Sequence, residues 1–115
     1  MPTISRKVKA GTDSNGAYHR QEIFNPPTPD FWPVSVSLKA KLLFPTDTTI
    51  ICTLDVDATD GKPQNDMQEF SFSTGEQISL GTWRLDGGDN IIVVSGHTSP
   101  SRINTEVEIE FEISF

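Results

Sequence analysis

The sequence predicts a single all-β domain, built as an antiparallel β-sandwich or jelly-roll of about eight strands. Three observations predict it. A chain of 115 residues has a common size for one domain, apolar and polar residues alternate along most of it, and clusters of Gly, Pro, Asn and Asp separate the alternating stretches. A closed antiparallel barrel is the alternative, because alternation does not specify how strands pair. We therefore treat residues 1–115 as one domain.

The clearest strand covers residues 106–115, where apolar residues occupy alternate positions and four glutamates stand between them. Residues 34–44 and 48–57 alternate in the same way, which is typical of strands with one face on a core and one in water. Cys52 lies on the apolar face of its strand, so we expect a buried and unreactive thiol. It is the one cysteine of the chain, so no internal disulfide can form.

The other strands are shorter or less regular. Residues 69–73 form a short strand, and residues 90–95 are apolar on both faces, which predicts a central strand. Residues 1–24 read as an N-terminal hairpin, and residues 25–33 hold four prolines, which predicts an extended connection. Residues 34–115 then carry the main strands.

One predicted strand changes phase in its middle. In residues 76–85, Leu80 and Trp83 fall on opposite faces of a regular strand. A bulge inserts one residue and often uses glycine, so a bulge at Gly81-Thr82 would return both side chains to the core. We predict a register change at that step.

The chain carries a formal net charge of −7, and the charge is unevenly distributed. Residues 1–41 hold six basic and three acidic residues, whereas residues 42–115 hold three basic and thirteen acidic ones. A net-acidic domain repels nucleic-acid phosphates and anionic lipids, so we expect no nucleic acid and no membrane as partners. With no apolar run longer than four residues, we expect no signal peptide or transmembrane segment, and a protein that is cytoplasmic or assembled into a particle.

The glutamates of residues 106–115 need oppositely charged neighbours, because like charges on one face of a strand repel. Basic segments around Lys7 and Lys39 could supply them. We therefore predict that the C-terminal strand lies beside one of these segments, with Glu108 and Glu110 near lysine side chains. No charged tail follows this strand, so it is also a candidate for pairing with another chain.

Asp55, Asp57 and Asp60, followed by Gly61, form an acidic turn of the kind that binds calcium when several carboxylates converge. The spacing exceeds that of an EF-hand loop by one residue, and the downstream glutamate and flanking helices are missing. The alternative is that two aspartates face water at a strand end and the third shapes a turn. We assign no metal and no cofactor, and keep these three carboxylates as the candidate metal site.

His97 is the candidate base of a small hydrolase, because Asp89, Ser95 and Ser99 are near it in the sequence. Neither a nucleophile elbow nor a His-Glu-x-x-His motif accompanies it. Ser, Thr and Asp are frequent throughout the chain, so such neighbours carry little information. We expect a protein that is not an enzyme.

Phe31 and Trp32 lie in the proline-rich segment. A stiff, extended segment loses little entropy on binding, so its aromatic rings favour a contact surface for a second copy, a peptide or a sugar. Tyr18 joins them as a candidate for stacking on sugars. The alternative is that both rings fill one end of the core. If the protein is an oligomer, we predict that Trp32→Ala weakens assembly.

No motif commits the chain to a reaction, so the sequence favours a non-catalytic structural or binding module. The first hypothesis is a homo-oligomeric subunit of a symmetric particle, such as a virion decoration or tail protein. The second is a carbohydrate-binding β-sandwich with a glycan or peptide ligand, and the third is the hydrolase that uses His97.

Overall fold

The computed structural model describes residues 3–25, 34–59 and 64–115. Within these ranges the chain forms eight strands and no helix. The strands are β1 (Thr3–Gly11), β2 (Ala17–Phe24), β3 (Val34–Phe44), β4 (Thr49–Ala58), β5 (Gln68–Ser73), β6 (Gln77–Leu85), β7 (Asn90–Ser99) and β8 (Glu106–Ser114). Accordingly, this part of the chain offers no apolar helix of membrane-spanning length.

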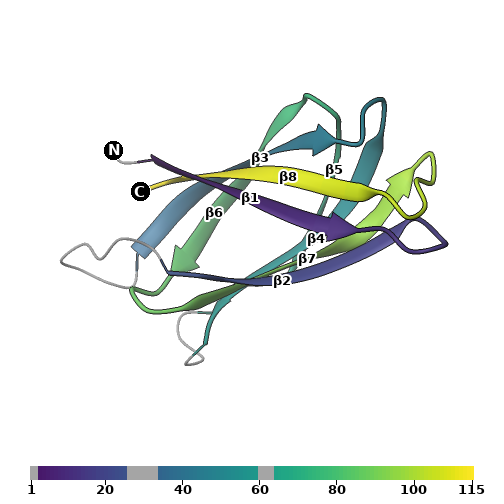
Figure 1. Ribbon diagram of the computed structural model, residues 1–115. Helices are drawn as coiled ribbons and strands as arrows, with labels where there is room; N and C mark the ends of the chain where they lie inside the picture. The colour runs from purple at the N-terminus through teal and green to yellow at the C-terminus, as the bar shows by residue number, and fades with distance from the viewer. Residues whose placement is uncertain (1–2, 26–33, 60–63) are drawn as a thin grey trace.

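The strands form two antiparallel four-stranded sheets that pack face to face (Figure 1). The first sheet has the order β1-β8-β3-β6, and the second has the order β2-β7-β4-β5. This confirms the predicted sandwich of about eight strands. The closed-barrel alternative is wrong, because no strand ladder joins the two described sheets into a cylinder.

The pairing has a mirrored pattern along the chain. β1 pairs with β8, β2 with β7, β3 with β6, and β4 with β5. Two further pairs, β3 with β8 and β4 with β7, join these ribbons side by side within each sheet. The chain is therefore one long antiparallel ribbon, folded back at the β4–β5 connection and wrapped over itself.

The hairpin predicted for residues 1–24 does not form. Both strands are present, but β1 bonds to β8 in one sheet and β2 bonds to β7 in the other. The side chains of β1 explain why it pairs with β8. Val8 lies opposite Ile109 on the core side, and Lys9 lies opposite Glu108 on the outer side. Both apolar and charge pairing thus favour β8 as the neighbour of β1.

β8 lies inside its sheet, between the two basic strands. Glu110 is opposite Lys7 on β1 and opposite Lys41 on β3, so the predicted position of β8 beside a basic strand is confirmed on both of its sides. Because both edges of β8 are paired, it has no free backbone edge to offer to another chain. The expectation that β8 could pair with another molecule is therefore wrong.

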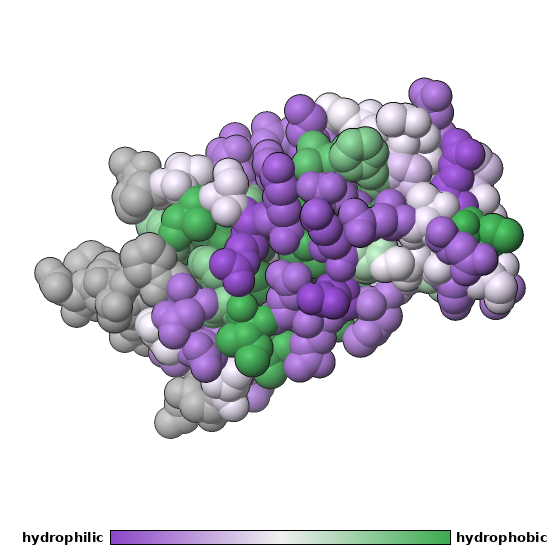
Figure 2. All heavy atoms as spheres, viewed as in Figure 1, coloured by the Kyte–Doolittle hydropathy of each residue, from purple (hydrophilic) through white to green (hydrophobic). Residues whose placement is uncertain are grey.

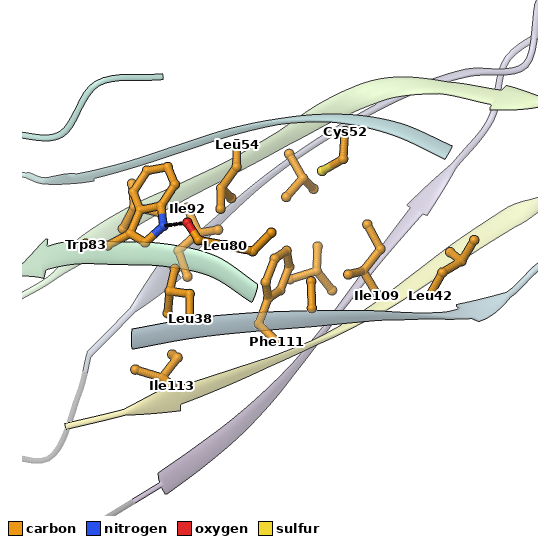
Figure 3. Packing of buried hydrophobic residues seen from close by; sticks show 14 of the residues in the cluster. Leu38, Leu42, Cys52, Leu54, Leu80, Trp83, Ile92, Ile109, Phe111 and Ile113 are labelled. Carbon is orange, nitrogen blue, oxygen red and sulfur yellow. Dashed lines mark hydrogen bonds between the residues drawn. The ribbon is translucent and has the colours of Figure 1, made fainter. Parts of the chain in front are cut away.

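The inner faces of the two sheets meet in one core, part of which Figure 3 shows. Trp83 and Phe72 are its largest fully buried side chains. All eight strands contribute to it, because each places alternate residues inward. Cys52 is 2% exposed on the core side of β4, so its predicted burial is confirmed. Burial raises the pKa of the Cys52 thiol to about 11.

The predicted register change in β6 is present, one residue before Gly81-Thr82. Leu38 of β3 pairs with Gly81 and the next residue of β3 pairs with Ser79, so Leu80 has no residue opposite it. Gly81 has a φ of 84°, which a residue with a Cβ adopts only with strain. The Leu80 carbonyl accepts a 2.9 Å hydrogen bond from the Trp83 indole, and both side chains are buried (Figure 3).

A fully buried asparagine shapes the β6–β7 turn. The Asn90 Oδ1 atom accepts a 2.9 Å hydrogen bond from the backbone N–H of Asp86, and its Nδ2 atom donates to the Asp86 carbonyl at 2.9 Å. The amide also donates to the Gly88 carbonyl at 3.3 Å. The Asn90 side chain thereby supplies hydrogen-bond partners for backbone groups of the turn that have none in a neighbouring strand.

Candidate functional site

Four turns converge at one end of the sandwich, called end A, on the right of Figure 1: residues 12–16, 45–48, 74–76 and 100–105. Their convergence follows from the topology, because every odd-numbered strand is joined there to the next even-numbered one. The opposite end, called end B, carries the β6–β7 turn, the last residues of β2 and β4 and the termini of the described chain.

Arg102 ties two turns of end A together. Its backbone N–H donates to the Thr98 hydroxyl at 2.7 Å, which anchors the β7–β8 turn. Its guanidinium donates to the Thr48 hydroxyl at 3.1 Å and to the Asp47 carbonyl at 3.3 Å. An arginine with several donors in fixed geometry holds the β3–β4 turn from several directions.

Threonines tie the remaining turns. Thr12 donates from its backbone to the Thr105 carbonyl at 2.8 Å, and the Thr105 N–H donates to the Thr12 hydroxyl at 2.9 Å. The Thr74 hydroxyl donates to the carbonyls of Pro45 and Thr48, which joins the β5–β6 turn to the β3–β4 turn. End A is therefore a set of cross-bonded turns rather than four independent loops.

Asp13 closes the β1–β2 turn. Its carboxylate accepts hydrogen bonds from the backbone N–H groups of Asn15 at 2.7 Å and Ala17 at 3.0 Å. These backbone donors hold the pKa of the Asp13 carboxyl below its ordinary value. The turn is thus ordered by an ionised carboxylate at neutral pH.

Two open hollows adjoin the β3–β4 turn. The first, about 460 Å³, is lined by hydroxyl-bearing and acidic residues: Thr46, Asp47, Thr48, Thr49, Ser73 and Thr74. The second, about 510 Å³, is lined by Phe44, Pro45, Thr46, Thr105, Glu106 and Glu108. The second hollow therefore combines an aromatic ring with two carboxylates.

Large apolar side chains are exposed at end A. Phe44 is 53% exposed at the second hollow, and Ile103 is 54% exposed in the β7–β8 turn. Figure 2 shows hydrophilic side chains over the middle of the visible face and a hydrophobic group at the end formed by the β1–β2 and β7–β8 turns. End A thus presents exposed apolar side chains on turns that are held in place by hydrogen bonds.

The structure overturns the sugar-stacking prediction for Tyr18. Its ring is 4% exposed, and its hydroxyl donates to the Ile51 carbonyl at 3.0 Å, reaching from β2 across β7 to β4. Burial raises the pKa of the Tyr18 hydroxyl. The ring faces the core, so it has no open face for a sugar. Phe31 and Trp32, the other residues of that prediction, lie outside the described residues.

Asp55 and Asp57 occupy neighbouring positions on the outer face of β4, and Asp60 lies outside the described residues. Partial burial and the neighbouring Asp57 carboxyl raise the pKa of the Asp55 carboxyl above its ordinary value. Asp57 accepts a 2.8 Å hydrogen bond from the backbone N–H of Asn65. No group of three or more His, Cys, Asp or Glu side chains converges on one point within residues 3–25, 34–59 and 64–115.

His97 lies on the outer face of β7, exposed to solvent. It is opposite Ala17 of β2 and opposite Ile51 of β4, so its cross-strand neighbours are apolar. Ser95 shares its face, but no hydrogen bond joins the two side chains in the described part of the molecule. Within residues 3–25, 34–59 and 64–115, no serine, threonine or cysteine side chain forms a hydrogen bond with this histidine.

Sequence reasoning missed Phe44 and Arg102 at end A, and it named Glu108 only as a neighbour of lysines. One sequence feature could have identified Arg102, because it is one of three basic residues in the acidic segment 42–115. A second signal was present at Phe44, because the predicted strand 34–44 ends there and Pro45 follows it. Their convergence depends on the topology, which alternation alone does not reveal.

Comparison with known proteins gave one structural similarity. No family model matches the chain, and no curated protein matches it. The chain is similar to one in the structure described as "Bacillus endospore appendages form a novel family of disulfide-linked pili", with a TM-score of 0.36 and 9% sequence identity. That match covers 99% of this chain and 88% of the other.

Proposed function

We propose that this protein is a non-catalytic structural subunit that assembles with copies of itself through the ends of the sandwich. One observation carries the proposal. Three of the four exposed large hydrophobic side chains of the described residues stand towards the ends of a molecule 44 Å long: Phe44 and Ile103 at end A, and Ile23 at end B. Apolar side chains gathered at opposite ends favour contacts along the long axis.

The edges of the sheets are poor alternatives for assembly, because each is protected against strand addition. β1 exposes Lys7 and Lys9, and β2 exposes Arg20 beside Glu22. β5 is six residues long. β6 is interrupted by the bulge at Leu80. Backbone pairing between molecules is therefore disfavoured at these edges, and the ends are left for assembly.

The hydrogen bonds of end A also support the proposal. A surface whose loops are already held in place loses little conformational entropy when a partner binds. Arg102 and the Thr12–Thr105 pair fix the backbone on both sides of Ile103, and Arg102 also holds the turn that follows Phe44. The apolar groups of end A are thus presented on a preorganised surface, as a contact between subunits requires.

The strand order is consistent with this role. The mirrored pairing of β1 with β8 through β4 with β5 is the connectivity expected for a jelly roll, a fold frequent in viral capsid and lectin domains. A fold does not specify a function by itself. We propose that the assembly is built from repeated copies of this chain, as in a virion decoration, a tail or a surface appendage.

Sedimentation velocity over a concentration series tests the proposal. We expect concentration-dependent association of the wild-type chain. The double variant Phe44→Ser with Ile103→Ser should reduce it, because each exposed apolar side chain loses its contact. The matched control is Val93→Thr, a half-buried outer-face residue of β7 far from both ends.

Circular dichroism accompanies each variant, so that unfolding is not mistaken for loss of assembly. A variant of end B, Ile23→Ser, separates two geometries. If end A meets end B, the end A double variant and Ile23→Ser both reduce assembly, whereas contacts between two copies of end A leave assembly of Ile23→Ser unaffected. A wild-type chain that stays monomeric at every concentration would refute the proposal.

A further inference from the structure

A buried carboxylate that forms no hydrogen bond or ion pair with the described residues lies at the second hollow of end A. Glu108 is 9% exposed and contributes to the wall of the hollow. In residues 3–25, 34–59 and 64–115, no hydrogen bond within 3.5 Å and no ion pair within 4 Å reaches its carboxylate. Burying an ionised carboxylate is costly unless a donor or a cation compensates it, so this position favours a positively charged partner.

The neighbours of Glu108 within the chain do not supply that partner. Lys9 is opposite Glu108 on β1, but it is exposed, and its ammonium does not come within ion-pair distance. Phe44 is opposite Glu108 on β3, and its ring offers no donor. The carboxylate therefore lies between a lysine that points to solvent and an aromatic ring.

The remaining walls of the hollow indicate which kind of cation fits. Glu106 adds a second carboxylate, Thr46 and Thr105 add polar groups, and the half-exposed ring of Phe44 adds an aromatic face. An aromatic face attracts ammonium and guanidinium groups and also contacts their alkyl stems. A bare metal ion prefers a full shell of oxygen ligands, which a wall of Phe44 and Pro45 does not provide.

We infer that this hollow binds an organic cation, the ammonium or guanidinium end of a lysine-like or arginine-like group. Its charge would be shared by Glu108 and Glu106, and its stem would lie on the ring of Phe44. The inference rests on the proposed function in one respect only, because a neighbouring copy is one source of such a side chain. The site itself requires no assembly.

Solution NMR tests the inference with small probes. The ¹⁵N-labelled chain is titrated with N-acetyl-lysine amide and N-acetyl-arginine amide, and with N-acetyl-norleucine amide as the uncharged control. We expect saturable shifts of the amide signals of Thr105, Glu106 and Glu108 with the two cations and none with norleucine. Absence of saturation, or an equal response to norleucine, would overturn the inference.

Variants separate binding from folding. Glu108→Gln should weaken cation binding roughly tenfold or more, because a charge-assisted contact is lost. The melting temperature of the same variant is measured in parallel, and a value no lower than that of the wild type shows that weaker binding is not caused by unfolding. The matched control is Glu112→Gln, which lies on the same face of β8 outside the hollow and should bind normally. Unchanged binding in Glu108→Gln would contradict the assignment.

Two further measurements complete the test. If Lys9 occupied the hollow in solution, the wild-type chain would bind no probe and Lys9→Gln would bind it, which would overturn the inference. Sedimentation of Glu108→Gln identifies the source of the cation. Weaker assembly assigns it to a neighbouring copy, and unchanged assembly assigns it to a separate ligand. A monomeric chain that binds the probes would refute the proposed function and support this site.

Discussion

The side-chain amide of Asn65 pairs with both backbone groups of Arg84. The Asn65 Oδ1 atom accepts from the Arg84 N–H at 2.7 Å, and its Nδ2 atom donates to the Arg84 carbonyl at 3.0 Å. The same amide donates to the Val56 carbonyl of β4. One side chain thus occupies a backbone position at the edge of β6 and links it to the other sheet.

Replacing this amide should loosen the β6 edge. We expect Asn65→Ala to lower the free energy of unfolding by about 1–3 kcal/mol, since it leaves backbone groups of β6 and β4 without their partner. Urea denaturation measures the loss, and faster hydrogen exchange of the Arg84 amide locates it. Asn15→Ala, at an exposed turn, is the control and should change neither quantity. An unchanged exchange rate in Asn65→Ala would show that the bond is not formed in solution.

Asp55→Asn should stabilise the protein at neutral pH. Burial and the Asp57 carboxyl raise the pKa of Asp55 in the folded state, so the folded state holds this proton more tightly than the unfolded chain does. Wild-type stability therefore falls as pH rises from the ordinary carboxyl range through the raised folded pKa. The Asp55→Asn variant has no carboxyl to ionise at this position, so it does not lose stability in that pH range.

Thermal melts from acidic to neutral pH check this. The advantage of Asp55→Asn should grow with pH and then stay constant, and Thr53→Ala, which changes a side chain without a titrating group on the same face of β4, should show no such trend. A lower melting temperature of Asp55→Asn at neutral pH would refute the argument.

Cys52 should react slowly with thiol reagents in the native state. It is 2% exposed, and burial raises the pKa of its thiol to about 11, so both access and the thiolate fraction are small. Absorbance after addition of an aromatic disulfide reagent measures the rate. Labelling should become fast in denaturant, and equally fast labelling without denaturant would mean that β4 opens readily.

Gly96→Ala should be among the most damaging single substitutions in the chain. A Cβ at Gly96 would lie 1.8 Å from the Ile51 carbonyl oxygen and 3.0 Å from the Tyr18 hydroxyl. The backbone would have to shift, and we expect a loss of about 3 kcal/mol or more in the free energy of unfolding.

Two variants bracket that result. Tyr18→Phe removes the hydroxyl that donates to the Ile51 carbonyl and should cost about 1 kcal/mol. Gly11→Ala meets no atom within 4 Å and should cost much less than Gly96→Ala. Equal stability of the Gly96→Ala and Gly11→Ala variants in denaturant would show that β7 can move away from β4.

Much of the sandwich could be predicted from alternation, because one face of most strands is apolar. Residues 34–44 and 106–115 had one apolar and one charged face, so their inner residues and the burial of Cys52 in β4 followed directly. The phase change at Leu80 likewise revealed the bulge of β6, displaced by one residue from the predicted step.

The inner face of β2 could not be predicted in this way. Tyr18 and Phe24 share that face with Arg20 and Glu22, which pair with each other at 3.4 Å where the sandwich is open at its edge. Without a continuous apolar face, Tyr18 could equally be assigned to the surface. Alternation of apolar and polar residues does not reveal the order of strands in a sheet. The position of β8 between two neighbours and the convergence of turns at end A therefore could not be predicted.

The mirrored pairing of strands has a consequence for the time course of folding. β4 and β5 are close in sequence, whereas Thr3 of β1 has to find Ser114 at the far end of the chain. Closing such a distant contact costs more chain entropy than closing a local turn. The ribbon should therefore begin at the β4–β5 connection and close outward, with the outermost pair last, and the chain should fold slowly compared with helical proteins of its size.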